Sequence, residues 1–142
     1  MANVYTVQVE VDGPRNTIVK LDGILDTSDI ATPVVLVNPA LLCGIDNTLT
    51  QKAQTFRVMR MNYTVEDGIF LGLDWDAPTP TRLAQLAGRG QMEYRDFGGL
   101  VNPAPTGATG NITFYTTGYT SGKVSFTLVL ELIKQQYLTK TN

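Results

Sequence analysis

The sequence predicts an all-β protein, an antiparallel β-sandwich that is best described as a jelly roll of about eight strands. Apolar and polar residues alternate over many short stretches, which is the pattern of half-buried strands. Turn residues separate these stretches roughly every 8–12 positions, as in sandwiches and barrels. Several connections are longer than a hairpin, which favours the jelly roll. An immunoglobulin-like sandwich is the second alternative, although the chain lacks its Cys…Trp…Cys pattern.

The first part of the chain contains three predicted strands, at residues 5–11, 17–25 and 33–37. In the first strand the odd residues from Tyr5 to Val11 are apolar and the even ones are polar, which predicts one buried face. The second strand repeats this alternation. The third is a short run that is apolar on both faces, and we expect it to be buried.

The middle of the chain contains the clearest predicted strand pair. Residues 56–66 are rich in Phe, Val, Tyr and Thr, which favour strands, and residues 69–75 alternate with apolar residues at odd positions. The Asp67-Gly68 dipeptide between them predicts a β-hairpin. Residues 40–55 show only a weak pattern, which fits either a turn of helix or an ordered loop.

The second half alternates strands with turn-rich segments. Residues 76–81 contain two prolines and predict a loop, and residues 98–110 are rich in Gly, Pro and Ala and predict a long exposed loop. Residues 82–90 fit either a short helix or an edge strand. The remaining strands are expected at residues 91–97, 111–119 and 124–132.

The chain length predicts one domain, residues 1–142, with a core that needs no disulfide. The N-terminus is expected to be short and flexible, and the polar segment from residue 133 to residue 142 is expected to fray, with a tail over about residues 134–142. Charged residues make up 17% of the chain, compared with about 25% in an average domain. So low a charge content indicates that part of the surface is covered by something else.

Composition argues against several classes of function. The chain has no His and a single Cys, so most residues that carry nucleophilic catalysis and transition-metal binding are missing, and we expect no enzyme activity, cofactor or metal. The net charge is −2 and the basic residues are scattered, which argues against nucleic acid as a partner. No apolar run approaches the roughly 20 residues of a membrane span, and we expect no signal peptide and synthesis in the cytoplasm.

A few residues could carry chemistry, and each has a structural alternative. Asp74 and Asp76 could act as paired carboxylates, but an Asp that caps a turn is the simpler interpretation. Trp75 could stack on a sugar, but it shares the apolar face of its strand and is expected in the core. Cys43 is expected to be a buried structural thiol. The glycines that flank Arg89 suggest an anion-binding turn, but the strand, helix and Lys of a phosphate loop are missing.

Tyr and Arg are enriched in protein–protein interfaces, and the chain has six tyrosines and six arginines. Some of the tyrosines must instead belong to the core, each with one polar end in contact with water. We interpret the following residues as candidate interface residues: Arg89, Tyr94, Arg95, Tyr119 and Tyr137.

Three segments of the chain resemble small virion proteins of tailed bacteriophages, the decoration or cement proteins on the outside of the head. These segments are VYTVQVEVDGPRN at residues 4–16, LAGRG at 86–90 with YRDFGGL at 94–100, and FTLVLEL at 126–132. The resemblance implies a β-sandwich or jelly roll, self-association as a homodimer or homotrimer, docking onto the major capsid protein, and a location on the outer capsid surface. Its motifs are structural, so it assigns no functional residue.

The first functional hypothesis is therefore a capsid decoration protein that bridges subunits of the major capsid protein and so stabilises the assembled head. The alternative is a carbohydrate-binding module of a host-adhesion device, which would turn Trp75 and several tyrosines outward. A third possibility, a glycosidase that uses Asp74 and Asp76, needs a deeper cleft than so small a sandwich usually provides.

Overall fold

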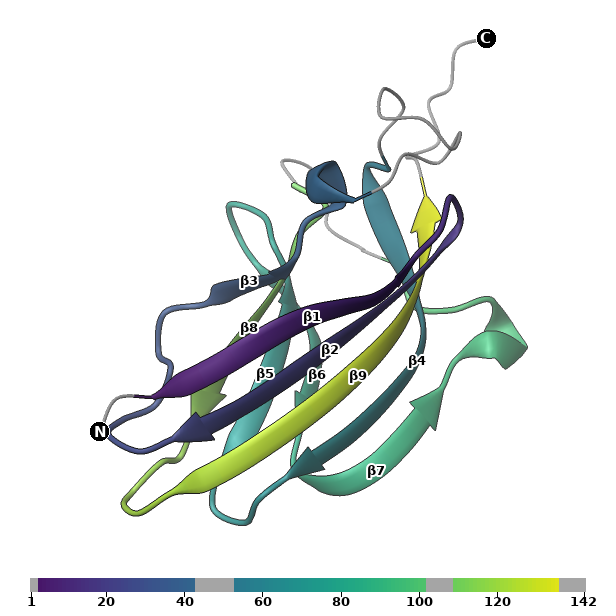
Figure 1. Ribbon diagram of the computed structural model, residues 1–142. Coiled ribbons are helices and arrows are strands. Elements are labelled where there is room, and N and C mark those ends of the chain that lie inside the picture. The colour runs from purple at the N-terminus through teal and green to yellow at the C-terminus, as the bar shows by residue number, and fades with distance from the viewer. Residues whose placement is uncertain (1–2, 43–52, 102–108, 136–142) are drawn as a thin grey trace, which may run out of the picture.

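Two antiparallel β-sheets pack face to face in this protein, which confirms the predicted β-sandwich (Figure 1). The computed structural model describes residues 3–42, 53–101 and 109–135. Sheet A has the order β1 (Val4–Asp12), β2 (Asn16–Leu25), β9 (Val124–Gln135), β4 (Thr55–Val65) and β7 (Gly88–Glu93). Sheet B has the order β3 (Val34–Val37), β8 (Ile112–Thr117), β5 (Phe70–Trp75) and β6 (Thr81–Leu86). Two 3-10 turns complete the described elements, η1 (Pro39–Leu41) and η2 (Arg95–Phe97).

The strand pairing is nested, which identifies the fold as the predicted jelly roll. β2 pairs with β9, β3 with β8, β4 with β7 and β5 with β6, and all four pairs are antiparallel. The chain from β2 to β9 therefore forms one long hairpin with its tip between β5 and β6. This hairpin is folded over, so that its pairs alternate between the two sheets, and the pairings β4–β9 and β5–β8 close each sheet. β1 is an additional strand at the edge of sheet A.

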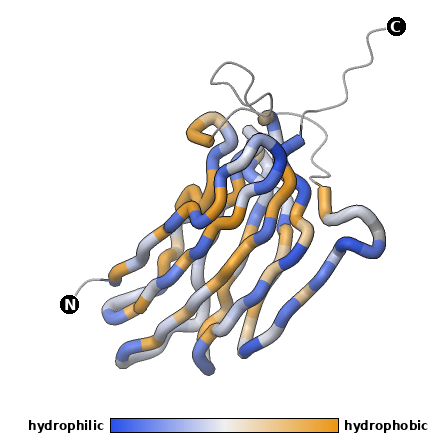
Figure 2. Tube along the Cα trace, turned by 45° about the vertical axis from the view of Figure 1, so that its right-hand side comes forward, coloured by the Kyte–Doolittle hydropathy of each residue, from blue (hydrophilic) through white to orange (hydrophobic). Residues whose placement is uncertain are grey.

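β9 organises the core because it pairs with β2 on one side and with β4 on the other. Its burial alternates without interruption along twelve residues, with Phe126, Leu128, Leu130 and Leu132 almost fully buried. Apolar and polar residues likewise alternate along the strands in Figure 2. Because each fully buried large side chain contributes about 1.5–3 kcal/mol, the inner faces of the two sheets supply most of the stabilisation.

Three glycines within strands lie opposite an aromatic residue of the neighbouring strand, whose ring covers the glycine. A Cβ atom at Gly23, for example, would lie 2.5 Å from a ring atom of Phe126. A glycine in a strand contributes no side chain to the packing, and the ring fills the space that is left. The pairs are Gly23 with Phe126, Gly72 with Tyr115, and Gly90 with Tyr63.

A β-bulge in β1 changes the face to which the end of the strand points. Val9 pairs with Val19 but Val11 pairs with Ile18, so Glu10 is the extra residue. Beyond the bulge Asp12 shares the inner face, where its carboxylate accepts a 2.6 Å hydrogen bond from the Nζ of Lys134. The side chain of Lys134 is fully buried, so this ion pair supplies the partner that a buried ammonium group requires.

The structure corrects the expected hairpin at Asp67-Gly68. β4 lies in sheet A and β5 in sheet B, and no pairing joins the two strands. The turn therefore carries the chain from one sheet to the other. Both strands bury one apolar face, and they do so from opposite sides of the same core.

Residues 82–90 contain two edge strands, and a single residue joins them. β6 ends at Leu86 in sheet B, β7 begins at Gly88 in sheet A, and only Ala87 lies between. Gly88 has φ +71°, a conformation that glycine adopts without strain, and this allows the sharp corner. The Gly-Arg-Gly motif thus makes a corner between the sheets at Gly88 and is covered by the ring of Tyr63 at Gly90, rather than forming a phosphate loop.

Two other boundaries also differ from expectation. The strand predicted at 91–97 ends at Glu93, and the 3-10 turn η2 follows because the backbone N–H of Gly99 returns to the carbonyl of Tyr94 at 2.8 Å. The C-terminal strand extends through Gln135, so Ile133 and Lys134 belong to β9 and not to a frayed tail.

The strand expected to be half-buried at residues 5–11 is mostly exposed in the structure.

Substitution of Gly23 by Ala is expected to lower the free energy of unfolding by about 1–3 kcal/mol, because its Cβ would overlap the buried ring of Phe126. Gly13→Ala is the matched control, since the nearest atom to its Cβ lies 3.7 Å away and its φ lies outside the left-handed region. Denaturation in urea measures both. Equal stability of the two variants would contradict the role of the ring contact.

Candidate functional site

The β1 edge of sheet A carries an unusual number of exposed apolar side chains. We define the β1 edge surface as the exposed apolar residues of β1 together with the neighbouring Ile24 of β2, namely Val4, Tyr5, Val9, Val11 and Ile24. Val9 is 47% exposed and Val4 63%. β1 pairs only with β2 among the described strands, so its outer row of N–H and C=O groups also faces away from the sheet. Unpaired strand edges with apolar side chains are sites of strand addition.

The inner face of β1 extends the inner face of β2 toward the edge of sheet A. Tyr5 pairs with Gly23 and Val9 pairs with Val19, and both of these β2 residues are buried. Val7 between them is partly buried against the core, and the ring of Tyr5 meets the ring of Phe114 edge-on, with centroids 5.4 Å apart. Tyr5, Val7 and Val9 therefore share the inner face as predicted, but the bulge at Glu10 turns Val11 to the outer face, where it pairs with Ile18.

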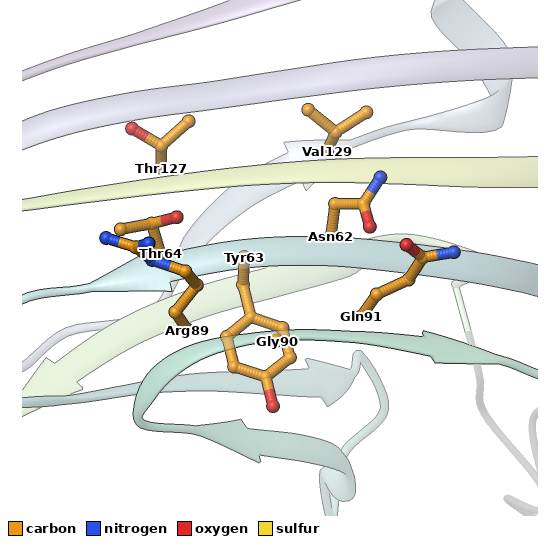
Figure 3. A pocket seen from close by; sticks show the side chains of 8 residues that line it. All are labelled: Asn62, Tyr63, Thr64, Arg89, Gly90, Gln91, Thr127 and Val129. Carbon is orange, nitrogen blue, oxygen red and sulfur yellow. The ribbon is translucent and has the colours of Figure 1, made fainter.

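A polar cleft of about 540 Å³ lies on the outer face of sheet A, over β9, β4 and β7 (Figure 3). Its lining combines amide, hydroxyl and guanidinium groups with one valine, and the hydroxyl of Thr127 already donates to Asp22 at 3.1 Å. Such groups can form hydrogen bonds with a polar ligand. The lining residues are Asn62, Tyr63, Thr64, Arg89, Gly90, Gln91, Thr127 and Val129.

Charged side chains form a ladder across the same face, next to the cleft. Glu131 of β9 pairs with Arg60 at 3.2 Å and with Arg95, and Arg95 also donates its Nε to Glu93 at 2.8 Å. The predicted interface residue Arg95 is thus engaged within the chain. Because these groups are partly or largely exposed, each pair contributes little to stability, but together they hold η2 against β4 and β9.

Arg89, the other predicted interface arginine, has a different environment. Its side chain is exposed on the outer face of β7 and lines the cleft. Within the described part of the chain it forms no hydrogen bond or ion pair. Of the two arginines, Arg89 is therefore the one whose charge is available to a partner.

The predicted interface tyrosines have structural roles in the fold. Tyr119 packs partly against the core and donates its hydroxyl to the carbonyl of Gly122 at 2.7 Å. Its backbone N–H donates to the carboxylate of Asp29 at 3.1 Å. Tyr94 is also partly buried, and burial together with the neighbouring Tyr63 raises the pKa of its phenol. Tyr137 lies outside the described residues.

Trp75 is 2% exposed, which confirms its expected place in the core and excludes it as a surface on which a sugar could stack.

Asp76 follows the end of β5, and its carboxylate accepts a hydrogen bond from the hydroxyl of Thr109 at 2.8 Å, as expected for a residue that caps a turn. Asp74 lies opposite Arg82 and Thr113 on the outer face of sheet B. Burial raises the pKa of the Asp74 carboxyl, and the charge of Arg82 opposes this shift.

Cys43, which was expected to be a buried structural thiol, lies outside the described residues. Among the residues that are described, no group of three or more His, Cys, Asp or Glu side chains could hold a metal ion. In that same part of the chain no helix has the length and apolarity needed to cross a bilayer.

Sequence reasoning did not find the β1 edge surface or the cleft. The apolar alternation of β1 is the same signal that a buried strand produces, and exposure depends on which strands lie opposite. The cleft is formed by residues from three strands that are distant in sequence. The glycine at position 90 was the one local signal, since an isolated glycine in a strand indicates close approach by a neighbour.

None of the known protein families, curated proteins or solved structures that were compared with this chain matches it.

Substitution of Asp74 by Asn is expected to raise the stability at pH 7, because the charged form of Asp74 is penalised by burial more than Arg82 compensates. The folded-state pKa lies above the ordinary value of 3.8, so the wild type binds more protons folded than unfolded between these two values. The free energy of unfolding of the wild type therefore rises toward that of the variant as the pH falls through the raised pKa. The stabilities of the two proteins become equal near pH 3.8, the ordinary pKa of the group. Urea denaturation between pH 3 and pH 7 measures the difference, and a difference that grows toward low pH would contradict this account.

Proposed function

We propose that this protein is a structural, non-enzymatic virion protein of a tailed bacteriophage, which binds the outer surface of the assembled capsid and stabilises it by bridging subunits of the major capsid protein. The jelly-roll sandwich is the fold that the sequence resemblance implied. The observation that carries the proposal is the β1 edge surface, where apolar side chains and unpaired backbone groups are exposed together. The protein would be made in the host cytoplasm and would join the head after assembly.

The β1 edge offers two kinds of contact to a capsid subunit. A strand or extended loop can pair with the free N–H and C=O groups of β1, which supplies affinity through the main chain. Tyr5 and Val9 would then be covered by the partner's side chains, and burial of their apolar area adds a favourable term. Glu10 and the bulge limit this pairing to the N-terminal part of the strand.

Stabilisation follows from binding to the assembled lattice in preference to free subunits. A ligand that binds one state only shifts the equilibrium toward that state by mass action. Contacts to more than one capsid subunit turn weak individual interactions into high avidity. The proposed mechanism therefore requires no chemical step, only a surface that complements neighbouring subunits.

Val9→Lys is expected to weaken binding to heads that lack the protein by about tenfold or more, because a charge would be buried against the partner. Val9 is about half exposed, so the fold should tolerate the change. Thr6→Lys is the matched control, since Thr6 lies on the same strand but on its outer face. Co-sedimentation of purified protein with such heads measures binding.

The decisive readout is the response of the heads to heat and osmotic shock. Heads saturated with wild type or Thr6→Lys protein should resist rupture better than bare heads, and heads mixed with Val9→Lys protein should resemble bare heads. Equal binding and protection by all three proteins would rule out the β1 edge as the docking surface. If complete and bare heads resist equally, the stabilising function itself is wrong.

The outer-face cleft supports a second candidate, a carbohydrate-binding module for host adhesion. Trp75 cannot serve it, but the amides of Asn62 and Gln91 beside Arg89 can bind sugar hydroxyls or a carboxylate. A glycan array probed with the wild type and with Asn62→Ala tests this candidate. It would be supported by a glycan that the wild type binds and the variant does not, and refuted if no glycan is bound.

A further inference from the structure

β7 forms the other open edge of sheet A, opposite to β1. It pairs with β4 on one side, and no described strand pairs with its other side. Gln91, Met92 and Glu93 are all exposed, and Met92 is 42% exposed although it belongs to the inner face. Unlike β1, this edge carries charges of both signs, with Arg89 near its beginning and Glu93 at its end.

The direction of the backbone groups on β7 follows from its pairing with β4. The N–H of Tyr94 donates to the carbonyl of Met59 at 2.9 Å, so the backbone of Tyr94 faces β4. In an antiparallel pair, residues alternate between those that exchange hydrogen bonds with the partner strand and those that point away from it. Met92 and Gly90 therefore face β4, while the N–H and C=O groups of Arg89, Gln91 and Glu93 point outward.

The side chains of Arg89, Gln91 and Glu93 match those of a second copy that is related to the first by a two-fold rotation. When two β7 strands run antiparallel about an axis through Gln91, Arg89 of one copy lies opposite Glu93 of the other, and this occurs twice. The two Gln91 residues then face each other, and their amides can exchange hydrogen bonds. All three residues lie on the outer face of the sheet, so that the facing groups are on the same side.

We propose that β7 pairs with β7 of a second copy of this chain, so that two five-stranded sheets become one ten-stranded sheet in a two-fold symmetric dimer. The interface is isologous, with Gln91 on the axis and an Arg89–Glu93 ion pair on either side of it. On the inner face, Met92 of each copy lies opposite Gly90 of the other, next to the ring of Tyr63 that covers this glycine. The exposed Met92 side chains are covered in this arrangement.

Other registers of the same edge match less well. An axis through Arg89 or through Glu93 places like charges opposite each other, which is unfavourable in a cross-strand pair. An axis through Gly90 or Met92 leaves Arg89 or Glu93 without an opposite charge. Glu93 already accepts a hydrogen bond from Arg95 through Oε1, but a carboxylate has about four acceptor positions and can receive Arg89 as well.

This interface is separate from the β1 edge surface and does not depend on capsid binding. In the ten-stranded sheet the two β1 edges lie at the far ends, where both remain accessible. A dimer would therefore present two copies of the proposed docking surface, which is the arrangement that bridging requires.

A disulfide at the axis tests the register. In a hydrogen-bonded antiparallel pair the Cα atoms lie about 5.5 Å apart, within the roughly 4.4–6.8 Å that a disulfide spans. Gln91→Cys in a Cys43→Ser background is therefore expected to form a covalent dimer under mild oxidation. Asn62→Cys in the same background is the control, because two Asn62 positions would be separated by about three strand spacings of ~4.8 Å.

Charge reversal tests the complementarity. The wild type is expected to sediment as a particle of twice the 15.5 kDa chain mass, and Arg89→Glu should weaken the dimer by about tenfold or more, since two like-charge contacts replace two ion pairs. The double variant Arg89→Glu with Glu93→Arg restores opposite charges and should restore the dimer. Circular dichroism of each variant checks that it remains folded.

The proposal stands if Gln91→Cys cross-links and Arg89→Glu shifts the equilibrium toward the monomer. It is overturned if the wild type is a monomer at all concentrations, if Gln91→Cys cross-links no faster than Asn62→Cys, or if Arg89→Glu leaves the dimer intact. Binding of the Val9→Lys variant to heads is measured separately, so that failure of the β7 dimer and failure of capsid docking remain distinguishable.

Discussion

The burial of one face of β9 is the constraint on which the rest of this fold depends. β9 is hydrogen-bonded along ten positions to β2 and along ten to β4, and its inward side chains form the centre of the core. A slip of one residue in either pairing would turn every inward side chain of β9 to the outside, so the alternation determines both registers at once. The nested pairing of the other strands then follows from their order along the chain.

None of the described edge strands pairs with β9, and individual side-chain interactions determine the structure at the edges and ends of the sandwich. Glu10 interrupts the pairing of β1 with β2, and the resulting change of face brings Asp12 to the buried ammonium of Lys134. Asp29 ties the β2–β3 connection to the end of β8, since its carboxylate accepts from the hydroxyl of Thr116 and the backbone N–H of Tyr119. These polar interactions stabilise the ends of the sandwich without adding apolar residues to its core.

Sheet A ends in two open edges of different chemistry, and this difference links the two proposals. β1 exposes apolar side chains and acidic groups, with no basic residue along its length, so it fits a different partner better than a copy of itself. β7 carries Arg89 and Glu93 symmetrically about Gln91, which suits a second copy. Protein edges are normally protected against pairing, and charges are one of the usual devices. On β7 the charges are placed so that they exclude most registers and favour one.

The local pattern of the sequence was sufficient to predict most of the strands, the sandwich and the place of Trp75, because alternation reports directly which face of a strand is apolar. It left residues 82–90 open between a short helix and an edge strand, where the structure has parts of β6 and β7. It was not sufficient for relations between strands. Asp67-Gly68 has the composition of a hairpin turn, yet it joins the two sheets, because the partner of a strand is selected by the burial of whole faces and not by the turn. The odd residues of β1 have the pattern of a buried strand but remain mostly exposed, because burial depends on whether the opposite sheet extends over them. Arg89 and Arg95 are indistinguishable in sequence, and only the tertiary structure places Glu93 and Glu131 beside Arg95 and leaves the charge of Arg89 to the surface.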